Sequence, residues 1–189
     1  MNVLEFKMIS SDYKYDVSYE TWSRIYEYPL VLDLLKKYSD NTDITIHNTS
    51  WGFGGCHITF KNKLDDIYKN SLHTDIKAST LKNTDIYDIT QSPPEKFINY
   101  FDFVLNISTL EEVRYDHIKT FNNLLSMVRS NGYLILTFDL PGLQLERFEN
   151  MLERKIDSVK NPINGRNSKI SNGRYEHLNC GYLVIQKEI

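Results

Sequence analysis

Cysteine is scarce in this sequence and an excess of basic charge is missing, and each of these excludes a class of function. Its 189 residues include two cysteines, Cys56 and Cys180, and neither belongs to a C-x-x-C pair. Zinc ligation is therefore not indicated, and we expect two reduced thiols in a cytoplasmic protein. Because the formal net charge is −3, there is no overall basic field for a polyanion, and we expect no nucleic-acid partner.

Long apolar runs and leader signals are missing as well. No apolar stretch approaches the ~20 residues of a membrane helix, so we expect no membrane partner. Residues 1–5 (MNVLE) lack the basic and apolar regions of a signal peptide. A chain of this length can bury a full core without a disulfide or a metal, and we expect a single domain.

The N-terminal forty residues are predicted to form an arm and covering helices. Residues 1–17 show no clear period and are expected to be an irregular arm or a short strand. One helix would carry Trp22, Ile25 and Tyr26. Pro29 would open a second, because a proline lacks only an N–H that the first turn does not need. Its apolar stripe is Val31, Leu34, Leu35 and Tyr38.

Strands and helices alternate in residues 41–189. The expected strands are 43–49, 71–77, 84–89, 101–107, 133–138 and 181–187. Expected helices follow the turn at 50–55, Asp116 and the turn at 141–142, with Asn131 and Gly132 ending the second of them. This alternation predicts a doubly wound, Rossmann-like α/β fold with a mostly parallel sheet, in which ligands bind at the carboxyl ends of the strands.

The turn at 50–55 (SWGFGG) is the first candidate binding loop. A nicotinamide fingerprint, G-x-G-x-x-G, fails here because its last position is His57. The segment instead resembles motif I of the class I S-adenosylmethionine-dependent methyltransferases, an acidic residue followed by x-G-x-G-x-G. Asn48 takes the acidic position, Ser50 the first glycine, and Gly52 and Gly54 the other two.

The downstream segments extend this resemblance over residues 20–187. It implies that Asp75, after the second strand, receives the ribose hydroxyls, and that Asp88 contacts the adenine amino group. A carboxylate suits a diol because it accepts two hydrogen bonds. Either aspartate can also be read as a cap or turn residue. The block from Asp102 to Val113 resembles the fourth-strand motif, and 181–187 fits the antiparallel last strand.

The resemblance implies S-adenosylmethionine as cofactor, with S-adenosylhomocysteine as product, and no metal. The segment 22–29 (WSRIYEYP) further resembles small methyltransferases of polysaccharide and glycan assembly, in which Arg24 would pair with the cofactor carboxylate. A surface arginine beside Glu27 is the competing interpretation. The implied cofactor-binding residues are Arg24, Asn48, Trp51, Gly52, Phe53, Gly54, Asp75, Asp88, Asn106 and Ser108.

An oxygen acceptor would need a general base, worth ~10²–10⁴-fold in rate. Glu111 directly follows the fourth strand and is the first candidate. His57 and His117 are the others, because a histidine has a suitable pKa for a base at neutral pH. His57 starts a helix, where packing or capping is the plainer role, and His117 lies in the first turn of another, where the helix dipole disfavours its protonation. Glu112 should point elsewhere.

The acceptor is expected to be a small molecule, with a sugar or sugar-nucleotide hydroxyl favoured by the glycan resemblance. Two other functions stay open: a degenerate methyltransferase fold used as a binding or scaffolding subunit, for which Asn48 and Ser50 argue, and a nicotinamide-dependent oxidoreductase. An assembly of identical chains also stays open.

Overall fold

The computed structural model describes residues 1–52, 54–114, 116–170 and 173–189. The strands are β1 (Asn2–Met8), β2 (Thr45–Thr49), β3 (Asn70–Asp75), β4 (Thr84–Ile86), β5 (Phe101–Ile107), β6 (Val128–Leu140) and β7 (Asn179–Gln186). The α-helices are α1 (Arg24–Tyr38), α2 (Gly55–Ile67), α3 (His117–Met127) and α4 (Leu145–Leu152). Short 3₁₀ turns are η1 (Val17–Tyr19), η2 (Glu95–Phe97), η3 (Leu110–Glu112) and η4 (Gly173–Tyr175).

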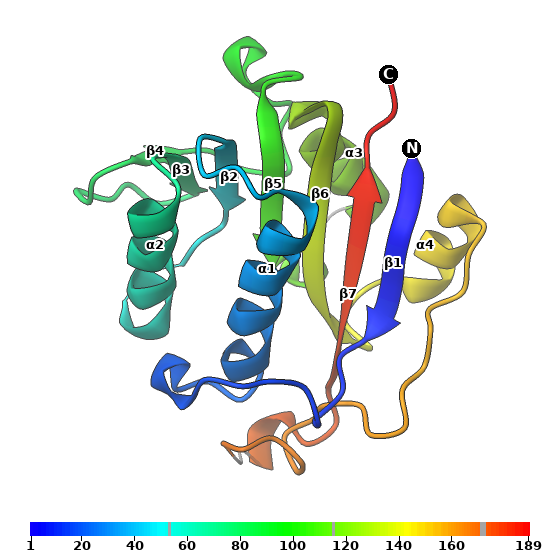
Figure 1. Ribbon diagram of the computed structural model, residues 1–189. Helices are drawn as coiled ribbons and strands as arrows, with labels where there is room; N and C mark the ends of the chain where they lie inside the picture. Colours follow the sequence, from blue (N-terminus) through cyan, green and yellow to red (C-terminus); the bar gives the residue numbers. More distant parts are fainter. Residues whose placement is uncertain (53, 115, 171–172) are drawn as a thin grey trace.

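The strands form one sheet in the order β1-β7-β6-β5-β2-β3-β4 (Figure 1). The strands from β2 to β6 pair in parallel, whereas β7 is antiparallel to both β6 and β1. The chain runs outward from β2 to β4 and then returns to the other side of β2 as β5. The strand order therefore reverses between β2 and β5, which is where ligands bind in such sheets. The predicted fold class is confirmed.

Helices cover both faces of the sheet. The core cluster on one face contains side chains of α1 and α2, including Ile25 and Phe60, and the cluster on the other face contains side chains of α3 and α4, including Phe121 and Phe148. Strand residues alternate between the clusters, so that Leu105 belongs to the first and Val104 to the second. Figure 1 shows α1 in front of the sheet and α3 behind it.

The prediction of two N-terminal helices separated at Pro29 is wrong. A single helix, α1, contains Pro29 in its interior. The ring leaves the carbonyl of Ile25 without its helical N–H partner, and the backbone N–H of Asp16 donates to that carbonyl at 2.8 Å instead. The preceding arm thus replaces the hydrogen bond that Pro29 removes, and the helix continues through the proline.

The N-terminal arm contains a strand, as one of the two sequence interpretations expected. β1 pairs with β7 at the edge of the sheet. Its Glu5 is buried and accepts hydrogen bonds from Lys37, Tyr38 and Tyr182. Burial opposes the charge of this carboxylate, but the hydrogen bonds from Lys37, Tyr38 and Tyr182 lower its pKa to about 2. The ionised carboxylate of Glu5 therefore links β1 to α1 and β7 by hydrogen bonds.

Asn131 and Gly132 do not end α3, contrary to the prediction. The helix ends at Met127, and both residues lie inside β6. A side chain at Gly132 would place its Cβ 2.7 Å from the carbonyl oxygen of Asp102. The glycine therefore allows β6 to pack closely against the start of β5, and it does not cap a helix.

Candidate functional site

The loop between β2 and α2 has the backbone shape that a ligand cradle requires. Ser50, Gly52 and Gly54 have φ values of 52°, 77° and 87°. This left-handed region favours glycine, and Ser50 adopts it at the position where motif I has its first glycine. Phe53 was also predicted to bind the cofactor, and it lies outside the described residues.

A cavity of about 350 Å³ opens beside this loop at the carboxyl ends of β3 and β4. Its lining comes from the loop, from the ends of both strands and from η3: Ser50, Asp75, Ile76, Asp88, Ile89, Thr90, Thr109, Glu112, Val113 and Arg114. Both predicted aspartates therefore face one cavity, and apolar side chains of Ile76, Ile89 and Val113 accompany them. This combination of carboxylates and apolar surface suits a nucleoside.

The two aspartates are oriented by backbone groups. Asp75 Oδ2 accepts a hydrogen bond from the N–H of Gly52 at 3.2 Å, which links the end of β3 to the glycine loop. Asp88 Oδ1 accepts from the N–H of Thr90 at 2.9 Å and from its hydroxyl at 2.7 Å. Asp88 thus has the turn role of the competing interpretation, and it also lines the cavity.

Three other residues predicted to bind the cofactor use their polar groups within the sheet or its loops. Asn48 Nδ2 donates to His73 Nδ1 at 3.1 Å, and Asn106 Nδ2 donates to Thr49 Oγ1 at 3.0 Å. The backbone N–H of Trp51 donates to the carbonyl of Thr74 at 3.3 Å. All three side chains are buried. Their roles toward a cofactor remain predictions.

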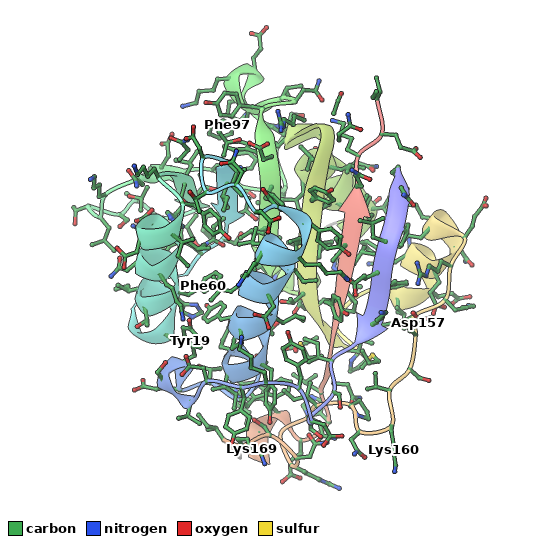
Figure 2. All side chains as sticks on the ribbon, in the orientation of Figure 1. Tyr19, Phe60, Phe97, Asp157, Lys160 and Lys169 are labelled. Carbon is green, nitrogen blue, oxygen red and sulfur yellow. The ribbon has the colours of Figure 1, made fainter. Side chains whose placement is uncertain are left out.

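A second, much smaller space of about 20 Å³ lies between the loop and α1. It is lined by Arg24, Tyr28, Asn48, Ser50, Trp51, His57, Phe60 and Ile107. His57 Nδ1 lies 2.6 Å from the Tyr28 hydroxyl, and burial and then Arg24 lower the pKa of His57. The Tyr28 ring of α1 stacks on the Phe60 ring of α2 with centroids 4.0 Å apart. Figure 2 shows Phe60 between the two helices.

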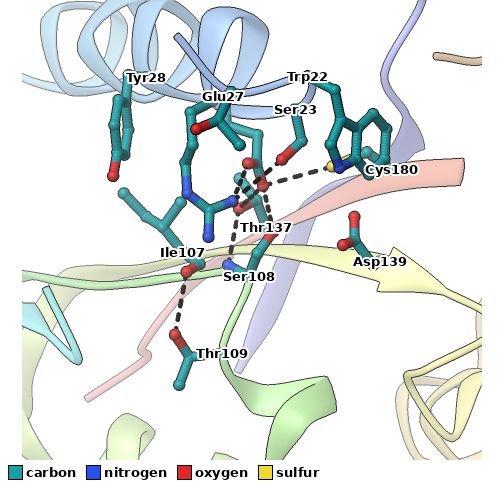
Figure 3. Close-up of polar contacts among 12 residues, drawn as sticks. Trp22, Ser23, Glu27, Tyr28, Ile107, Ser108, Thr109, Thr137, Asp139 and Cys180 are labelled. Atoms are coloured by element: carbon teal, nitrogen blue, oxygen red, sulfur yellow. Dashed lines mark hydrogen bonds and ion pairs between the residues drawn. The ribbon is translucent and has the colours of Figure 1, made fainter. Parts of the chain in front are cut away.

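Arg24 forms an ion pair with Glu27, and Glu27 has no exposed surface. Figure 3 shows the hydrogen bonds that converge on Glu27. Its Oε1 accepts from the hydroxyls of Ser108 and Thr137, with the Cys180 thiol at 3.4 Å. Burial opposes ionisation of Glu27, but Arg24 and these donors lower its pKa. The competing interpretation of Arg24 was right about its neighbour and wrong about the surface, since only 14% of the arginine side chain is exposed.

Two further acidic residues, Glu111 and Asp139, lie near Glu27 and interact with each other. Glu111 Oε1 accepts from the backbone N–H of Asp139 at 2.7 Å, whereas its Oε2 is buried without a hydrogen-bond partner. Burial and the charge of Asp139 raise the pKa of Glu111 to about 8. Burial and the charge of Glu27 raise the pKa of Asp139 to about 7. Both carboxyl groups can therefore exchange protons near neutral pH.

The remaining candidates differ from Glu111 in their surroundings. His117 Nε2 donates to the carbonyl of Val113 at 3.0 Å, and its Nδ1 accepts from the N–H of Gln144 at 3.4 Å. Both ring nitrogens therefore bind backbone, which favours a structural role. Glu112 is exposed and lines the large cavity, so it points away from Glu111.

Several residues of the site were missed from the sequence: Glu27 as a buried centre, Tyr28, Thr137, Asp139 and Cys180. Thr137, Asp139 and Cys180 approach Glu27 or Glu111 only through long-range packing, so no local pattern marks them. The sequence did offer a sign that Glu27 is buried, because it lies between Tyr26 and Tyr28 in a mostly apolar stretch. The structure shows that residues 25–31 of α1 are buried.

Two features are absent from the described residues. They form no group of three or more His, Cys, Asp or Glu side chains placed to hold a metal ion. Within the same residues, no helix combines the length and the apolar character that crossing a membrane requires.

Comparison with known proteins shows a shared fold. No protein-family model matches the sequence, and no curated protein does. Among solved structures, the [4+2]-cyclase SpnF matches with a TM-score of 0.60 and 10% identity, over 100% of this chain and 89% of that one. Geranyl diphosphate methyltransferase, in complex with its substrate and sinefungin, matches with a TM-score of 0.55 and 9% identity, over 97% and 89%.

A third structure is phosphoethanolamine N-methyltransferase 2 of Haemonchus contortus, in complex with S-adenosylhomocysteine. It matches with a TM-score of 0.52 and 9% identity, over 85% of this chain and 53% of that one, so this chain spans about half its length. These likenesses establish that the chain has the Rossmann-like fold found in methyltransferases.

Proposed function

We propose that this chain binds S-adenosylmethionine and transfers its methyl group to an oxygen of a small acceptor. The observation that carries the proposal is the 350 Å³ cavity beside the glycine loop, at the carboxyl ends of β3 and β4, lined by Ser50, Asp75 and Asp88. The resemblance assigned Asp75 and Asp88 to the cofactor and placed Ser50 at the first glycine position of motif I, and these three residues come from three separate segments of the chain. Their convergence on one cavity supports a nucleoside-containing ligand.

The residues around both cavities fit the two ends of this cofactor. Asp75 and Asp88 keep carboxylate oxygens at the large cavity for the ribose and the adenine. Arg24 lines the small cavity, and its Nε is buried without a hydrogen-bond partner. An unpaired guanidinium N–H suits a carboxylate. When bound, S-adenosylmethionine supplies an electrophilic methyl group, and the protein mainly has to hold the acceptor in line with it.

Glu111 is the residue that we propose as general base. Its Oε1 is held by the Asp139 backbone, and its Oε2 has no partner and is left to accept a proton. A group with a pKa of about 8 binds that proton strongly while still being partly ionised at neutral pH. A hydroxyl acceptor needs such a base. The sugar or sugar-nucleotide acceptor is a narrower proposal that rests on the resemblance of residues 22–29.

A ligand screen by thermal unfolding tests the proposal. Saturating S-adenosylmethionine or S-adenosylhomocysteine should stabilise the folded chain by about 2.7 kcal/mol at 100 times Kd. NAD at the same concentration should leave the melting temperature unchanged. Stabilisation by NAD alone would instead support an oxidoreductase.

A binding or scaffolding subunit is the second candidate function. It is favoured by the closed state of the space beside Arg24, about 20 Å³, and by the use of the Asn48 amide within the sheet. A well-folded chain that neither S-adenosylmethionine nor S-adenosylhomocysteine stabilises would support this candidate over the enzyme.

A further inference from the structure

The two parts of the proposed cofactor site differ greatly in volume. The part beside Asp75 and Asp88 encloses about 350 Å³, and the part beside Arg24 encloses about 20 Å³. Ser50 lines both parts, so they lie on either side of the glycine loop. A space of 20 Å³ holds no more than a single water molecule. The amino-acid end of the cofactor therefore cannot enter it without movement of a side chain.

His57 is the side chain that occupies this position. A Cβ on Gly52 would lie 2.9–3.1 Å from three atoms of the His57 ring, so the imidazole lies directly against the glycine loop. Tyr28 holds the ring there through the 2.6 Å contact between its hydroxyl and Nδ1. Tyr28 itself is 2% exposed and stacked on Phe60, so it is the fixed partner. His57 is only half-buried, so it is the partner that we infer to move.

The closed space has the chemistry of an anion site. Arg24 lines it and is paired with Glu27 through Nη1, whereas its buried Nε has no hydrogen-bond partner. A buried N–H of this kind is costly unless a ligand supplies an acceptor. The carboxylate of an amino acid would supply one after His57 has moved away.

We propose that the Tyr28–His57 hydrogen bond is a latch that closes the amino-acid half of the site. With the latch closed, the open half accepts adenine nucleosides that lack an amino-acid chain. The whole cofactor binds only when His57 turns away from Gly52, so this pair of residues sets the preference between nucleoside and cofactor. The inference rests on the proposed function.

Calorimetric titration with adenosine and with S-adenosylhomocysteine tests the latch. Tyr28→Phe keeps the ring that stacks on Phe60 and removes only the hydroxyl. Losing one hydrogen bond in the closed state should tighten S-adenosylhomocysteine binding by about 2- to 10-fold. Adenosine affinity should stay unchanged. Tyr26→Phe is the matched control, because the Tyr26 hydroxyl contacts the Lys169 backbone away from both cavities, and it should alter neither affinity.

A second variant keeps the test decisive if Tyr28→Phe folds poorly. His57→Ala removes the ring itself and should also tighten S-adenosylhomocysteine binding selectively. Equal S-adenosylhomocysteine affinities in the wild type and both variants would overturn the latch and leave the proposed cofactor standing. An equal gain for adenosine would overturn it too. If neither ligand binds any of the folded proteins, the proposed function itself is wrong.

Discussion

The two sides of the glycine loop hold their charged groups in opposite ways. On the Asp75 side, carboxylates at the edge of an open cavity accept hydrogen bonds from nearby backbone N–H groups. On the Arg24 side, Arg24 and Glu27 of α1 form an ion pair, and burial, Asp139 and Glu27 raise the pKa of Glu111. Binding on the open side requires little rearrangement. The buried side instead supplies fixed charges and shifted pKa values, which are properties that chemistry needs.

Glu27→Gln should have the largest effect, because it breaks the centre of the buried side. The amide can still accept from Ser108 and Thr137, but the buried Arg24 loses its counter-charge. Breaking such a pair costs about 3–5 kcal/mol of unfolding free energy. Urea denaturation measures it, with the exposed Glu20→Gln as control. A loss as small as that of the control would mean that Arg24 is solvated.

Glu111→Gln should come next, with an effect on turnover. If Glu111 removes the proton of the acceptor, kcat should fall by ~10²-fold or more, because an amide keeps the shape but cannot take the proton. Cofactor affinity should hardly change. Glu146→Gln, an exposed glutamate of α4 that lines neither cavity, is the control and should be nearly silent. A folded Glu111→Gln enzyme with normal kcat would remove Glu111 from the mechanism.

Asp75→Ala tests the open side. If the carboxylate accepts the ribose hydroxyls, cofactor affinity should fall by about 1.5–3 kcal/mol, the range for hydrogen bonds to charged groups. The variant should lose little more with a 2′-deoxyribose analogue, which the wild type should discriminate against. Asp85→Ala is the control, since Asp85 is exposed on β4 and pairs with Lys96. Equal discrimination by the wild type and Asp75→Ala would exclude the ribose role.

A further effect is expected on the pH dependence of stability. Glu111 has a folded pKa of about 8 against an ordinary value of 4.5, so the folded state binds more protons than the unfolded state between these values. Its contribution to stability is therefore present below pH 4.5 and is lost as the pH rises through about 8. Melting temperatures across this range should decline less in Glu111→Gln than in the wild type. Parallel profiles would show that Glu111 titrates normally.

The open side could largely be predicted from the sequence, and the buried side could not. Asp75 and Asp88 each follow a strand, so the parallel sheet alone places them at the same edge. The buried side depends on contacts between distant segments, such as Cys180 with Glu27. Nothing local in the sequence indicates which strand end will lie beneath α1.

The errors in the predicted elements have the same origin. Pro29 is a sound local signal for a helix start, and the distant Asp16 backbone overrides it. Gly132 is a sound local signal for a helix end. In the structure it lies in β6, where the close approach of the Asp102 backbone leaves no room for a side chain. The strand at 101–107, in contrast, matches β5 in both bounds because its apolar run is buried on both faces.

A crystal structure of the chain with S-adenosylhomocysteine tests the central claim most directly. The account predicts the adenosine between Asp75 and Asp88, the carboxylate on Arg24, and the His57 ring turned away from Gly52. An adenosine outside the cavity beside Asp75 would contradict the proposed site. A ligand bound there with the His57 ring still against Gly52 and hydrogen-bonded to Tyr28 would contradict the division of the site into an open and a closed half.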